Sequence, residues 1–100
     1  MTIATSAQLK TTLAADEPPA DLDLLLHGLW WAAKGNWQRA HEIAQSDESR
    51  DGAWLHAHLH RVEGDHGNAA YWYRRAGQPV PTTSVADEWD AMAEALLRPK

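Results

Sequence analysis

Three histidines stand at alternate positions in the middle of the chain, at residues 56, 58 and 60. On a helix, His56 and His60 lie one turn apart on the same face, and Glu63 follows on the next turn. Two imidazoles and a carboxylate at this spacing can bind a divalent transition metal such as zinc. His58 points in another direction and cannot join them. The sequence therefore predicts a metal site of His56, His60 and Glu63, or, in the simpler interpretation, imidazoles that fill partly buried positions between helices.

The tryptophans are the second group of residues that could recognise a ligand. The chain has six tryptophans and no phenylalanine, and tryptophan is enriched where proteins bind one another most tightly. Trp37 and Trp72 occupy positions expected to pack between helices, whereas Trp31 and Trp54 flank the faces of longer helices and are better surface candidates. The predicted partner-binding surface consists of Trp31, His27, Trp54, His56 and His60.

No constellation of catalytic residues emerges, and we expect no enzymatic activity. The chain lacks cysteine, which excludes disulfides, thiolate metal ligands and cysteine nucleophiles. His41 and Glu42 begin a zinc-protease motif, but no second histidine follows at the required spacing. A glycine-rich phosphate loop, a serine-nucleophile motif and a spaced pair of acid and base groups are also missing from the sequence.

Length, composition and charge indicate a single globular domain and argue against a nucleic-acid-binding or membrane protein. One hundred residues with 44% apolar composition suit a single globular domain. The net charge of −5 and a single adjacent basic pair, Arg74–Arg75, argue against nucleic acid as a partner. No apolar run is long enough to cross a membrane, and the first fifteen residues lack the features of a signal peptide. We expect a cytoplasmic protein.

Apolar residues recur with helical spacing throughout, and no segment alternates with the period of a strand. The pattern predicts an all-α domain over residues 1–100, with helices near 6–16, 20–34, 37–45, 51–63, 68–76 and 85–97. It divides into an N-terminal segment (1–19), two helical hairpins (20–47 and 51–77) and a C-terminal capping helix (83–98). On that last helix, Asp87, Glu88, Asp90 and Glu94 are expected to face solvent. Its apolar face, with Trp89 and Met92, could join a second copy in a homodimer.

The two hairpins are similar to each other in sequence. Aligning Gly35 with Gly64, a shift of 29 residues, places His27 on His56 and Trp31 on His60. In the second copy, Gly64 and Asp65 stand at the turn, and Ala69, Tyr73, Ala76 and Pro81 follow it. Residues 22–81 thereby resemble tetratricopeptide and Sel1-like helical repeats, and the whole chain looks like a family of small bacterial proteins without an assigned activity.

This resemblance implies a fold and a function. The fold would be antiparallel helical hairpins stacked as a short tetratricopeptide-like solenoid of about five to six helices. The function would be binding of a protein or peptide in a groove lined by the first helix of each hairpin. Partner binding is therefore the leading expectation from the sequence, and binding of a metal or small ligand is the alternative.

Overall fold

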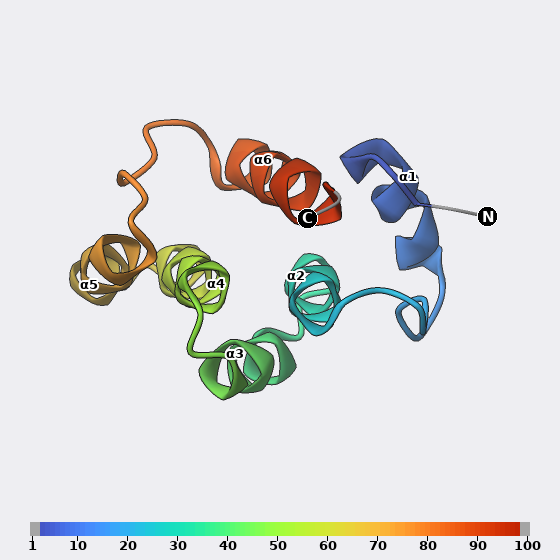
Figure 1. Cartoon of the computed structure of the whole chain (residues 1–100), viewed down its shortest axis with the longest axis horizontal. Helices are drawn as coiled ribbons and strands as arrows, with labels where there is room; N and C mark the ends of the chain where they lie inside the picture. Colours follow the sequence, from blue (N-terminus) through green and yellow to red (C-terminus); the bar gives the residue numbers. More distant parts are fainter. Residues whose placement is uncertain (1–2, 99–100) are drawn as a thin grey trace.

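The computed structural model describes residues 3–98. Helices are the only regular secondary structure in this range, and turns and loops connect them (Figure 1). The elements are α1 (Ser6–Thr11), the 3₁₀-helix η1 (Thr12–Ala14), α2 (Leu24–Ala33), α3 (Trp37–Ser46), α4 (Arg50–Val62), α5 (His66–Ala76) and α6 (Val85–Leu97). The prediction of an all-α protein is confirmed. Within this described part, no helix has the length and apolar character that crossing a bilayer requires.

Polar caps and glycines set where the helices begin and end. The side chains of Thr5, Asn36, Ser49, Asp65 and Ser84 each accept a hydrogen bond from a backbone N–H of the first helical turn. Gly35, Gly64 and Gly77 end three helices with positive φ angles of 83°, 85° and 70°.

Two helix starts differ from the prediction. Asp65 caps α5, so the helix begins at His66 and not near residue 68. Helix α2 begins at Leu24, after Asp23 at its N-cap, and not near residue 20; residues 18–23 lie outside the helix.

Helix α2 lies at the centre of the hydrophobic core. Leu29 and Trp30 of α2, Leu55 and Leu59 of α4, and Met92 of α6 are all shielded completely from solvent. The indole N–H of Trp30 donates to Thr12 Oγ1 at 2.9 Å. These contacts surround α2 with residues of three other elements, η1, α4 and α6.

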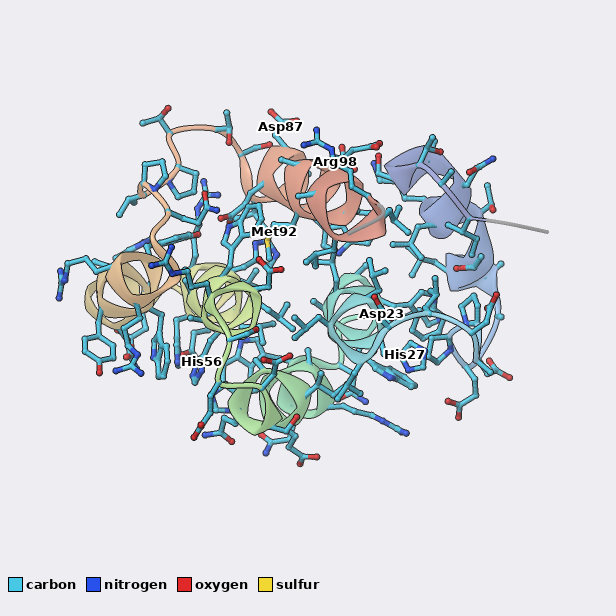
Figure 2. The ribbon with its side chains drawn as sticks, in the orientation of Figure 1. Asp23, His27, His56, Asp87, Met92 and Arg98 are labelled. Atoms are coloured by element: carbon cyan, nitrogen blue, oxygen red, sulfur yellow. The ribbon has the colours of Figure 1, made fainter. Side chains whose placement is uncertain are left out.

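Helices α2 and α3 form one hairpin, and α4 and α5 form the other (Figure 1). Helix α6 packs on both α2 and α4, and α1 lies beside α6. The indole N–H of Trp89 donates to the carbonyl of Leu29 at 2.8 Å, and Figure 2 shows Met92 pointing from α6 towards the interior. The face of α6 expected to join a second copy is thus buried within the single chain.

The expectation that the carboxylates of the last helix all face solvent is wrong for Glu88, which is buried. Its side chain is only 4% exposed and reaches three partners on α4 and α5. Its carboxylate accepts hydrogen bonds from Tyr73 Oη at 2.6 Å and Arg61 Nη1 at 3.2 Å, and Oε1 lies 2.7 Å from His58 Nδ1. A buried carboxylate is tolerated when its oxygens are paired in this way. By contrast, Asp87 points outward from α6 (Figure 2).

Candidate metal site

Helices α3 and α4 are held together at both ends. At the connection between them, Gly52 has no side chain, and its α-carbon approaches the backbone of Asp47 too closely for any other residue. At the far end, the indole N–H of Trp37 donates to the carbonyl of Leu59 at 2.7 Å. The two anchors fix the distance between the facing sides of α3 and α4, where the histidines lie.

Three imidazoles meet between these helices. His41 comes from α3, and His56 and His60 come from α4, one helical turn apart. His41 Nε2 lies 3.1 Å from His56 Nε2. One ligand nitrogen from each of the three rings can be chosen so that all three lie within 4.8 Å of one another. His56 and His60 are buried, and His41 is half-buried.

Tryptophan rings wall this histidine cluster (His41, His56 and His60) on two sides. Trp37 stacks on His41 with ring centroids 4.5 Å apart and an interplanar angle of 13°. Trp72, from α5, stacks on His56 at 3.8 Å and 12°. Figure 2 shows His56 on the side of α4 that faces α3 and α5. Stacking fixes the orientation of the rings, so their nitrogen atoms have defined directions.

Burial and mutual repulsion favour the neutral form of His41 and His56. Burial, together with the neighbouring His41 and His60, lowers the pKa of His56 to about 4. Burial and the proximity of His60 also lower the pKa of His41. At neutral pH both rings are therefore neutral, the form in which a ring nitrogen carries a lone pair for a metal.

Glu63 holds His60 from the opposite side of its ring. His60 Nδ1 lies 2.6 Å from Glu63 Oε1, which leaves Nε2 as the free ring nitrogen. A carboxylate bound to the second nitrogen is the usual support of a metal-ligating histidine. Glu63 and Asp65 also form a group with His60 that satisfies the same distance limit, but both carboxylates are exposed to solvent.

The structure therefore brings together two of the three residues predicted from the sequence. His56 and His60 face the same space, but the third group beside them is the imidazole of His41, and Glu63 lies behind His60. The sequence motif at His41 and Glu42 does not indicate this position. The place of His41 one turn after Trp37 and three residues before Ala44, both on the inward side of α3, could have revealed it.

The residues predicted to bind a partner do not form an exposed surface. Trp31 is only 8% exposed and its ring is covered by Arg39, whose guanidinium lies 4.4 Å from the ring centroid. His27 Nε2 lies 2.9 Å from the carbonyl oxygen of Pro19, and Trp54 packs against the core. The expectation that Trp31 lies at the surface is wrong, because α3 covers it.

The comparisons with known proteins add no identification. No family model, no curated protein and no solved structure matches this chain.

Proposed function

We propose that this protein binds a divalent transition metal through His41, His56 and His60. The observation that carries the proposal is the convergence of three imidazoles from two helices, with the Nε2 atoms of His41 and His56 3.1 Å apart. Two nitrogen ligands of one tetrahedral zinc ion lie about 3.3 Å apart, given zinc–nitrogen distances of about 2.0 Å. The Nε2 atoms of His41 and His56 already have this separation, and a ring nitrogen of His60 lies within 4.8 Å of a nitrogen of each of the other two rings.

The donor set selects the kind of metal. Imidazole nitrogen suits zinc, copper and nickel, whereas magnesium and calcium take oxygen ligands. Three protein ligands leave a fourth position on a tetrahedral ion for water or an exogenous ligand. Glu63, bonded to His60 Nδ1, would fix the ring so that Nε2 faces the ion.

Equilibrium dialysis of the untagged protein against zinc tests this proposal. We expect one zinc ion per chain in the wild type and loss of binding in His41→Ala and His56→Ala. Glu63→Gln keeps all three imidazoles and should weaken binding by about 10- to 100-fold, as supporting residues do. If Glu63 were a ligand in place of His41, His41→Ala would bind zinc as the wild type does.

His27→Ala is the matched control, because His27 lies on α2 and bonds to a carbonyl outside the cluster. It should bind zinc like the wild type. Helicity of every variant is checked by circular dichroism before dialysis. A folded wild-type protein that takes up no zinc, copper or nickel would contradict the proposal, and the imidazoles would then be packing groups alone.

We also propose a second function, binding of an amphipathic helix from a partner protein. It is favoured by the position of α6, which lies across the first helices of both hairpins, α2 and α4. In a tetratricopeptide-like arrangement these helices would line the groove, and α6 would occupy it as a bound peptide does. A partner helix would have to take the place of α6.

A labelled peptide of residues 84–98 tests whether α6 can be exchanged. We expect the full chain carrying Glu88→Gln to bind this peptide more tightly than the wild type, because the substitution weakens the attachment of the protein's own α6. Fluorescence anisotropy measures the binding. Absence of binding to both proteins would contradict exchange at this face.

A further inference from the structure

A pocket lies on the other side of α4 from the histidine cluster, where η1, α2, α4 and α6 meet. Its volume is about 470 Å³, within the range of small-molecule sites, roughly 300–1,000 Å³. Most of its lining is apolar, namely Leu13, Ala32, Ala33, Val62, Val85, Ala86 and Trp89. Val62 and Val85 remain 46% and 39% exposed.

The pocket has two polar lining residues, and both are basic. The remaining lining residues are Lys10 at its edge and His58, and no carboxylate belongs to the lining. His58 Nδ1 is engaged by Glu88, so Nε2 is the ring nitrogen left for a ligand. Lys10 Nζ lies 2.5 Å from Asp90 Oδ1, but the lysine side chain is 49% exposed and keeps further donors.

We propose that this pocket binds a small amphiphilic carboxylate, a molecule with one apolar tail and one anionic head. The tail would lie against Trp89, Val62 and Val85, which would lose their contact with water. The head would lie at Lys10, the cation of the lining, where it would share the exposed ammonium group with Asp90. The pocket thus has the composition of a ligand site, with apolar walls and a few polar groups that fix orientation.

Octanoate is the probe, titrated into the ¹⁵N-labelled full chain and followed by two-dimensional NMR. We expect saturable shifts at Ala33, Val62 and Ala86, and at the indole N–H of Trp89. Lys10→Gln should weaken binding by about three- to fivefold, as expected for an ion pair near the surface. Octan-1-ol has the same tail without the charge and should bind more weakly than octanoate.

Ala86→Phe fills the pocket and should abolish the shifts. Ala91→Phe is its matched control, since Ala91 is an exposed residue of the same helix outside the lining, and it should bind octanoate like the wild type. Three results would overturn the proposal: no saturable shifts in the wild type, unchanged binding in Ala86→Phe, or equal binding of octan-1-ol and octanoate.

Discussion

Replacing Glu88 by Gln is expected to lower the free energy of unfolding by about 3 kcal/mol, because it removes one member of a buried charge network. The amide loses the negative charge that faces Arg61 and cannot accept at both former oxygens from His58 and Tyr73. For a chain of this length the melting temperature should fall by roughly 10–20 °C. Denaturant unfolding followed by circular dichroism measures the change.

Asp87→Asn is the control, because the neighbouring Asp87 is exposed and its replacement should change stability by no more than about 0.5 kcal/mol. Equal losses in the two variants would show that burial of Glu88 contributes nothing of its own.

The pH dependence of stability gives an independent check of the same network. Burial alone would raise the pKa of Glu88, but hydrogen bonds from His58 and Tyr73, with Arg61 beside them, outweigh it and lower the pKa below its usual value of 4.5. The unfolded chain therefore takes up the proton first as the pH falls. The stabilisation is complete above about pH 4.5 and is lost as the pH falls through the folded-state pKa. Glu88→Gln should show a weaker loss of stability over that range.

Replacing Gly52 by Ala is expected to destabilise the fold by about 2–3 kcal/mol, as overpacking does. A Cβ atom at this position would overlap the carbonyl oxygen of Asp47 and lie 2.9 Å from its carbonyl carbon. Backbone atoms cannot rotate away, so the connection between α3 and α4 must open. Denaturant unfolding measures the loss, and zinc dialysis should show weaker binding, because His41 moves away from His56.

Gly67→Ala serves as the opposite control. Gly67 is helical, and a Cβ there meets no atom within 4 Å. Alanine should therefore stabilise α5 by roughly 0.5–1 kcal/mol through its higher helix propensity. If Gly52→Ala were as stable as the wild type, the tight α3–α4 connection would not be required for the fold.

The helices could be predicted from the sequence because their signals are local. Leu55 and Leu59 mark the buried side of α4, and Ser84 marks the start of α6. The position of α6 across both hairpins could not be predicted, since it depends on contacts such as that of Trp89 with Leu29, sixty residues apart. The same long-range packing buries Glu88, whose place beside Asp87 suggested a solvated face.

The candidate metal site was only partly predictable for a similar reason. His56 and His60 share a helix, so their spacing alone places them together. His41 is on another helix, and it joins them only when α3 packs against α4 at a particular register. Glu63 has the spacing of a ligand, but its hydrogen bond to His60 Nδ1 gives it a supporting position that spacing cannot distinguish.

The contact between α1 and α6 has a consequence for the order of folding. The backbone N–H of Ser6 donates to Glu94 Oε1 at 2.9 Å, across 88 positions of the chain. Closing so long a loop loses more chain entropy than pairing the adjacent helices of a hairpin. Proteins form contacts between sequence neighbours faster than contacts between distant segments. The hairpins α2–α3 and α4–α5 should therefore form first, and the docking of the two ends should complete the native structure.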